Sequence, residues 1–252
     1  MTQDILTSEP DDGVLVVTLN RPHVLNALDV PAKERLGEVW AEAAHDASVR
    51  AVVLCGAGDR GFSAGSDIKE MRRTGRMVTT DTLMAAIPGV SSPFEKPIVA
   101  ALHGFTVGFG LTLAIHCDFR IASRGSRMGF PEVQHGMLSG ISAITLPGVI
   151  GEARALDLML TGRLLEDQEA LAIGLVHQLS DHALDDAIKL ARELAGNSSL
   201  AMQLTKRLVL ESRRARIHEF SQSVDQARQE VTRSREFGDV VENRAGTGRA
   251  RT

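Results

Sequence analysis

The stretch HGFTVGFGLT, residues 103–112, follows an apolar, β-branched run and leads into a helical pattern, with glycines at positions 104, 108 and 110. Glycines at such a connection let the chain turn sharply and let a ligand approach backbone N–H groups. The spacing differs from the dinucleotide-binding pattern G-x-G-x-x-G, and no acidic residue ends a following strand at the expected place, so nicotinamide binding is not expected. We interpret Gly108-Phe109-Gly110 instead as a turn that aims a backbone N–H outward.

Further apolar runs lie on both sides of this stretch and are bounded by Gly, Pro, Asn or Asp. We predict strands at residues 14–19, 51–54, 98–102 and 119–122. Between the first two, apolar residues recur at spacings of three and four over residues 31–47, which predicts a helix with Asp29 as its N-terminal cap. Strands that alternate with helices indicate an α/β fold with largely parallel pairing.

The C-terminal third has a mostly helical pattern. We predict helices at residues 152–160, 184–195, 200–210 and 217–235, interrupted by a short apolar stretch at 174–179. The apolar stripe of the helix at 184–195 must be buried, either on its own domain or at a subunit interface. The Gly- and Arg-rich tail at 244–252 is expected to be poorly ordered.

The composition limits the classes of partner. The 252 residues include 28 Lys and Arg against 32 Asp and Glu, so a net charge of −4 gives no reason to expect nucleic-acid or membrane binding. The acidic start of the chain does not predict a signal peptide, and no run of 18 apolar residues predicts a membrane span. Cys55 and Cys117 form neither a disulfide framework nor a metal motif, so we expect a reducing, cytoplasmic setting, with small molecules or copies of the chain as partners.

A second small-residue segment, GFSAGSDIKEM at residues 61–71, leads from a strand to a helix that opens with Asp67, Lys69 and Glu70. Taken alone, it fits a simple tight turn equally well. Its Ser66 N–H and the Phe109 N–H could converge on one carbonyl oxygen. Such a pair would stabilise negative charge as the oxygen becomes an oxyanion or enolate.

A third segment, MGFPEV at residues 128–133, carries a carboxylate just after a proline. An exposed loop glutamate would need no explanation. If Phe130, Val133 and Met137 shield Glu132 from water, however, its neutral form is favoured and its proton affinity rises, which suits a general acid/base.

Other polar residues do not form a recognisable centre. His103, His116 and His135 lack the spacing of metal ligands, so no metal is expected. Ser63 and Ser139 lack the G-x-S-x-G pattern of serine hydrolases.

Together and in this order, the three segments resemble the crotonase superfamily, the enoyl-CoA hydratase/isomerase family. The resemblance covers nearly the whole chain. It begins at LNRPHVLNAL, residues 19–28, which is similar to the family signature N-R-P-x-x-x-N-A-L. It continues through the three segments to LTGR at 160–163, A-x-x-x-G-L-V at 170–176, REFG at 235–238 and VENR at 241–244.

The resemblance implies a spiral of β-β-α turns, with residues 1–190 as the core that holds CoA and the active site. Residues 191–252 would form a helical oligomerisation region, assembled as a homotrimer or a hexamer of two trimers. The substrate would be an acyl-CoA thioester, with CoA part of the substrate and no further cofactor.

The family motifs also imply roles for single residues. The Ser66 and Phe109 amides would donate hydrogen bonds to the thioester oxygen. The CoA portion would run past residues carried over from the two motifs: Leu25, Ala64, Asp67, Ile68 and Lys69.

Two departures from the family pattern bear on the reaction. Hydratases of the family carry two glutamates, whereas this chain has Thr112 at the first position and keeps Glu132 at the second. The usual I-P-G-x-G-G has become LSGISA at 138–143, which keeps Gly140 but adds bulk. Thr112 and Gly140 are expected to line a modified acyl pocket, and whether His135 and Ser139 reach it stays open.

Four activities fit these features. Moving a double bond from the 3- to the 2-position needs one base, so a 3-enoyl-CoA isomerase with Glu132 as acid/base is favoured. The alternative is a 2-enoyl-CoA hydratase in which Thr112 or a bound water orients the nucleophile. Less favoured are another crotonase reaction, such as thioester hydrolysis, decarboxylation or racemisation, and a non-catalytic acyl-CoA-binding protein.

Overall fold

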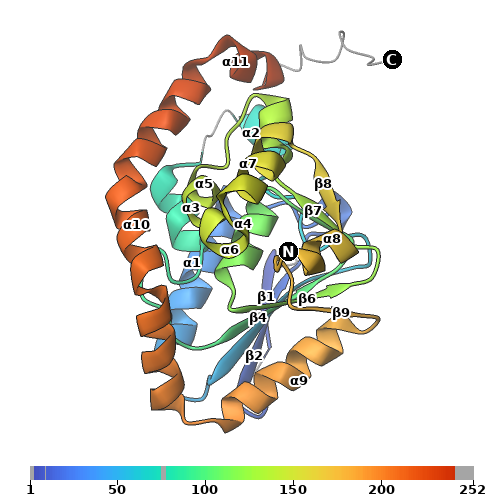
Figure 1. Cartoon of the computed structure of the whole chain (residues 1–252), viewed down its shortest axis with the longest axis vertical. Helices are drawn as coiled ribbons and strands as arrows, with labels where there is room; N and C mark the ends of the chain where they lie inside the picture. Colours follow the sequence, from blue (N-terminus) through green and yellow to red (C-terminus); the bar gives the residue numbers. More distant parts are fainter. Residues whose placement is uncertain (1–2, 9, 75–77, 242–252) are drawn as a thin grey trace.

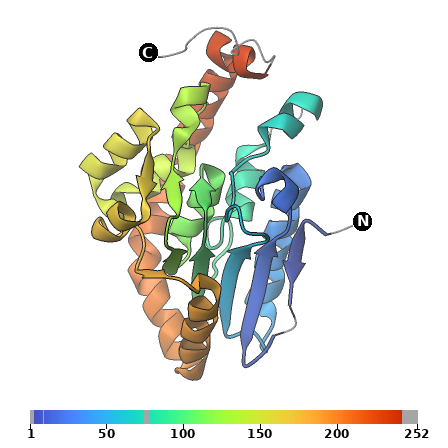
Figure 2. The ribbon, with the colours of Figure 1, turned by 90° about the vertical axis from the view of Figure 1, so that its right-hand side faces the viewer.

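The computed structural model describes residues 3–8, 10–74 and 78–241, and its strands form two sheets (Figures 1 and 2). In the described residues the larger sheet has the order β1-β2-β3-β4-β6-β9, and only β1 runs antiparallel to its neighbour. Its strands are β1 (Ile5–Thr7), β2 (Val14–Leu19), β3 (Ala51–Gly56), β4 (Ile98–Leu102), β6 (Phe119–Ser123) and β9 (Gln178–Ser180). The predicted α/β fold is therefore confirmed, with largely parallel pairing.

The smaller sheet gives the chain its spiral course. It consists of β5 (Phe105–Val107), β7 (Arg127–Gly129) and β8 (Leu164–Glu166). After β4 the chain passes through β5 into helix α4 (Phe109–His116), and after β6 it passes through β7 into the 3-10 helix η2 (Pro131–His135). These repeated turns are the β-β-α spiral implied by the sequence, and both end where a helix begins beside a glycine-rich or proline-containing loop.

The two faces of the larger sheet are covered by different helices. On β3, Val53 and Cys55 share a cluster with the alanines of α9 (Ala183–Gly196). Val52 and Leu54 belong to the cluster formed with α1 (Val30–His45) and α4. The alternation follows from the two-residue period of a strand. The apolar stripe at 184–195 therefore packs on its own domain, although Leu184 at its start stays 42% exposed.

The remaining helices follow the predicted pattern in part. Helix α1 (Val30–His45) begins as predicted, because the Asp29 side chain accepts a hydrogen bond from the Ala32 amide at 2.9 Å. The others in the described chain are η1 (Pro22–Val24), α2 (Ile68–Thr74), α3 (Thr80–Ala86), α5 (Gly140–Thr145), α6 (Pro147–Ile150), α7 (Glu152–Thr161) and α8 (Asp167–Ala172).

The C-terminal region is one long helix rather than two. Helix α10 (Ser199–Arg233) runs along one side of the molecule, and α11 (Arg235–Val241) then lies beside α2 and η2 (Figure 1). The predicted break at residues 211–216 was wrong because this segment, ESRRAR, has lost only the apolar periodicity and contains no helix breaker. The predicted disordered tail lies outside the described residues, and the division at residue 190, which falls within α9, stays a prediction.

We predict that Gly104 is needed for the packing of the two loops that carry the site. Gly104 has φ of +50°, and a Cβ there would overlap the Arg60 carbonyl. Gly125 has φ of +77° with no atom within 4 Å of a Cβ, so Gly125→Ala isolates the backbone cost, about 1–2 kcal/mol. Gly104→Ala should lose at least about 2 kcal/mol more in urea unfolding, and equal losses would contradict the clash.

Candidate active site

Two loops from successive turns of the spiral are joined backbone to backbone. The Ser63 amide donates to the Phe105 carbonyl at 3.1 Å, and the Val107 amide donates to the Ser63 carbonyl at 3.0 Å. At this junction a Cβ on Gly110 would lie 2.7 Å from the Ser63 Cβ, and a Cβ on Gly65 would lie 2.9 Å from the Val107 carbonyl oxygen. Only glycine permits this approach at both positions.

This junction brings the two predicted amides together. A Cβ on Gly65 would lie 3.0 Å from the Phe109 nitrogen, so the residue before Ser66 touches the amide of Phe109. Phe109 is the first residue of α4, where amides have no intrahelical acceptor. In the described residues neither the Ser66 nor the Phe109 amide donates a hydrogen bond. Both residues line one cavity and could donate to a common oxygen there.

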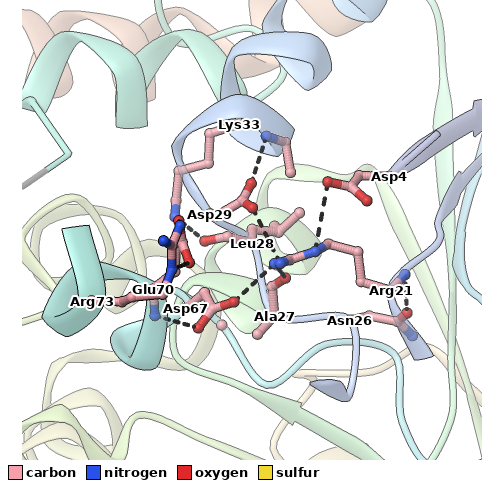
Figure 3. Close-up of polar contacts among 12 residues, drawn as sticks. Asp4, Arg21, Asn26, Ala27, Leu28, Asp29, Lys33, Asp67, Glu70 and Arg73 are labelled. Carbon is pink, nitrogen blue, oxygen red and sulfur yellow. Dashed lines mark hydrogen bonds and ion pairs between the residues drawn. The ribbon is translucent and has the colours of Figure 1, made fainter. Parts of the chain in front are cut away.

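The N-R-P-x-x-x-N-A-L motif, residues 20–28, stabilises the loop that carries Ser66 (Figure 3). The Arg21 guanidinium lies 3.1 Å from Asp29, 3.0 Å from Asp67 and 3.6 Å from Asp4. The buried Asn26 side chain accepts from the Arg21 amide and donates to the carbonyls of Ala57 and Gly61. These contacts fix the turn that precedes α1 against the loop that carries Ser66.

The cavity has a volume of about 310 Å³, and its lining includes Glu132 and six of the nine other predicted site residues. They are Ala64, Ser66, Ile68, Phe109, Thr112 and Gly140. Leu25, Asp67 and Lys69 do not line it: the Leu25 carbonyl accepts from the Ala64 amide, Asp67 pairs with Arg21 and caps α2, and Lys69 is exposed. His135 and Ser139, left open by the sequence, both line the cavity.

Glu132 is the second residue of η2, and its carboxyl lies beside Gly108. A Cβ on Gly108 would lie 3.2 Å from Glu132 Oε1, so the carboxyl borders the turn that holds the Phe109 amide. Glu132 Oε2 and Ser139 Oγ are buried without a hydrogen-bond partner in the described residues. Burial raises the pKa of Glu132, and the nearby Ser139 hydroxyl opposes the shift in part. Phe130 is buried as predicted, but Val133 was wrongly expected to shield the carboxyl, since it is 44% exposed.

Thr112 occupies the first of the two positions where hydratases of the family carry a glutamate. Its hydroxyl lies 2.8 Å from Ser142 Oγ and 3.2 Å from the Gly108 carbonyl, which it donates to. Both hydroxyls are buried. Among the described residues that line the cavity, Glu132 is therefore the single carboxylate.

Two cations near the cavity were not anticipated from the sequence. Lys33 on α1 is 1% exposed, donates to the Leu28 carbonyl and lies 5.2 Å from the centre of the Phe109 ring. Burial lowers its pKa to about 7, although Asp29 and Asp67 oppose the shift. Arg228, from the C-terminal half of α10, lines the cavity itself. Of the two, the sequence could have indicated only Lys33, because it lies on the same helical face as Leu36 and Trp40.

The described residues hold no cluster of three His, Cys, Asp or Glu that could bind a metal ion, and Cys55 and Cys117 are both free thiols. In the part of the chain that the structure describes, no helix is long and apolar enough to span a membrane.

The spiral fold and the paired free amides define the class of the protein: an enzyme of the crotonase superfamily. The sequence pattern of the enoyl-CoA hydratase/isomerase family matches residues 9–239, so the chain belongs to that family.

Named relatives and solved structures agree with this assignment. The chain is 37% identical over 205 residues to (E)-benzylidenesuccinyl-CoA hydratase of Thauera aromatica, with 80% of each chain covered. It is 35% identical over 209 residues to the short-chain-enoyl-CoA hydratase of Clostridium acetobutylicum, covering 80% of this chain and 79% of the relative. The crystal structure of an enoyl-CoA hydratase/isomerase from Pseudoalteromonas atlantica T6c matches with a TM-score of 0.85 at 30% identity, covering 99% and 100% of the two chains.

We predict that Glu132 lowers the stability of the fold near neutral pH. Its pKa in the folded chain is raised above the ordinary 4.5, so the folded state must hold an ionised, buried carboxylate when the pH exceeds that raised value. Glu132→Gln should therefore raise the melting temperature near neutral pH. The gain should vanish as the pH falls below 4.5, where the carboxyl is neutral in both states.

The exposed Glu193→Gln is the matched control for this measurement. Calorimetry across the pH range should show little change for the control at any pH. A Glu132→Gln variant with an unchanged or lower melting temperature near neutral pH would contradict the burial cost.

Proposed function

We propose that the protein is a 3-enoyl-CoA isomerase with Glu132 as its only acid/base. The Glu132 carboxylate removes a proton from C2 of the 3-enoyl thioester, and the electron pair moves to the thioester oxygen. The Ser66 and Phe109 amides stabilise the resulting dienolate. Glu132 then returns the proton to C4 and leaves the double bond between C2 and C3.

The observation that carries this proposal is that Glu132 is the single carboxylate among the described residues that line the cavity. Isomerisation uses one group first as base and then as acid, and a pKa raised by burial suits both roles. A hydratase must activate water and also deliver a proton to C2, which two carboxylates divide between them. With Thr112 in the first of the two positions, the cavity keeps the one carboxylate that proton shuttling needs, Glu132.

Substrate binding in this proposal follows the family pattern. CoA is part of the substrate, and no other cofactor is used. The thioester end lies beside Ala64 and Ile68, and the rest of CoA runs past Leu25, Asp67 and Lys69. The Asp67 carboxylate then acts by holding the loop through Arg21 rather than by touching CoA. We propose a cytoplasmic location.

A 2-enoyl-CoA hydratase is the second candidate. The names of two relatives, which both contain the word hydratase, favour it. The Ser139 hydroxyl, which has no partner in the described residues, could hold a water molecule beside Glu132. In this reaction Glu132 would perform both proton transfers.

Substitution of Glu132 tests the proposal. Glu132→Gln keeps the shape of the side chain but removes its basicity, so turnover of 3-hexenoyl-CoA should fall by at least about 10³-fold while thioester affinity changes little. Proton NMR of the wild type with 3-hexenoyl-CoA and crotonyl-CoA reports double-bond migration or water addition. Preserved turnover in the variant would contradict the proposal. Addition of water without migration of the double bond would establish the 2-enoyl-CoA hydratase.

We also propose a homotrimer or a hexamer of two trimers. Large apolar side chains are exposed at helical spacing on two helices: Leu156 and Leu160 on α7, and Leu200, Leu204 and Leu208 on α10. Light scattering should give three or six times 27.1 kDa.

Leu160→Glu and Leu208→Glu place a charge on these surfaces without touching the core, because both leucines are 70% exposed. At least one variant should dissociate into smaller species with its secondary structure intact. A wild type that elutes as a monomer would contradict the assembly.

A further inference from the structure

Arg228 occupies a part of the cavity that the proposed reaction does not use. It lines the cavity together with Val231 and Thr232 of the same helix. Its guanidinium donates to the Val78 carbonyl at 2.9 Å and to Thr80 Oγ1 at 3.1 Å. These two bonds attach α10 to the start of α3, but a guanidinium has five N–H donors.

The charge of Arg228 has no partner in the described residues. Among the described residues, no carboxylate oxygen lies within 4 Å of the Arg228 guanidinium. Asp225 is the acid that raises the pKa of Arg228, but its two carboxyl oxygens accept hydrogen bonds from Thr80 and Gln229. Burial lowers the pKa of Arg228 more than Asp225 raises it.

Two other arginines show how this protein satisfies a guanidinium for structural purposes. Arg120 donates to three backbone carbonyls, and Arg21 meets three carboxylates. Arg228 has neither arrangement. Among the residues that line the cavity near Arg228, Val78 and Val231 are apolar and Thr232 is polar but uncharged. A half-buried cation on such a wall is stabilised by a ligand that supplies an anion.

The charge of Arg228 also acts on Lys33, which lies beside a residue that lines the cavity, Phe109. Arg228 is one of the groups that lower the pKa of Lys33, whose ammonium lies under the Phe109 ring. Two cations that repel each other would both be stabilised by one anion in the cavity.

We propose that Arg228 binds a carboxylate carried by the acyl group of the substrate, so that the preferred substrates are monothioesters of dicarboxylic acids. This inference rests on the proposed function, since it takes the cavity as the acyl site. A neutral acyl chain would leave the guanidinium unpaired, whereas a carboxylate would accept two of its free N–H groups in a fork. Arg228 is then a specificity residue, separate from the proton transfer at Glu132.

Binding of saturated thioesters tests this independently of turnover. Succinyl-, glutaryl- and adipyl-CoA are compared by calorimetry with butyryl-, valeryl- and hexanoyl-CoA, so that the CoA part is constant. At least one dicarboxylic thioester should bind about tenfold or more tightly than its neutral match, the strength of one hydrogen bond to a charged group.

Three variants assign the preference to Arg228. Arg228→Gln keeps amide donors toward Val78 but removes the charge, and the ratio of affinities should fall to about one. Arg228→Lys keeps the charge and should retain part of the preference. Arg233→Gln, at an exposed arginine on the same helix, is the control and should leave the ratio unchanged.

The outcomes separate the two proposals. Equal affinities for both series in the wild type, or an equal loss for both in Arg228→Gln, would mean that Arg228 only anchors α10 and would overturn this inference alone. If no thioester of either series binds, the acyl-CoA function and the inference both fail.

Discussion

The site depends on a close approach of two backbones that no side chain other than hydrogen permits. Residues 61–66 and 104–110 come from successive turns of the spiral and meet at Gly65 and Gly110, where a Cβ would collide with the opposite loop. Because the backbones meet there, the Ser66 and Phe109 amides lie side by side with no acceptor in the described residues. The cavity, the position of Glu132 beside Gly108 and the course of α4 all follow from this junction.

Around this junction the protein holds charges in places that do not favour them. Glu132 is raised in pKa by burial, Lys33 is lowered in pKa under the Phe109 ring, and Arg228 has no carboxylate partner among the described residues. Each lowers stability when the site is empty, and each becomes favourable when a ligand supplies a proton or a charge. In contrast, Arg21 with its three carboxylates supports the loop and faces no such cost. Arg21, whose charge is paired, therefore supports the structure of the site, whereas the residues with unfavourable charges are the ones expected to act on a ligand.

Local sequence predicted most of the fold, because its strands are short β-branched runs and its first long helix has a clear cap. Strands β2 and β4 match the predicted residues, and Asp29 caps α1. Periodicity could not predict that α10 continues through residues 211–216, since a solvent-facing turn of a helix needs no apolar residue. Val133 was misjudged because the orientation of η2, set by tertiary packing, turns it toward solvent.

The candidate site was predictable where motifs are local and hidden where it is assembled over distance. Ser66, Phe109 and Glu132 lie in short segments with unusual glycine or proline spacing, so the sequence indicated them. Arg228 lies on α10, which begins 90 residues after the start of α4. Its neighbours on α10 show no motif. Lys33 lies on the same helical face as Leu36 and Trp40, which indicates burial, although a lysine in an amphipathic helix is ordinarily a surface residue.

A single desolvated carboxylate that moves one proton is the central claim, and transfer of a label from C2 to C4 measures it most directly. 3-Hexenoyl-CoA deuterated at C2 is converted in ordinary water, and the product is examined by NMR and mass spectrometry. The account predicts 2-hexenoyl-CoA with deuterium at C4, delivered by the group that removed it. A product with solvent oxygen at C3 and no deuterium at C4 would contradict it and would mean that water, rather than Glu132 alone, takes part in the reaction.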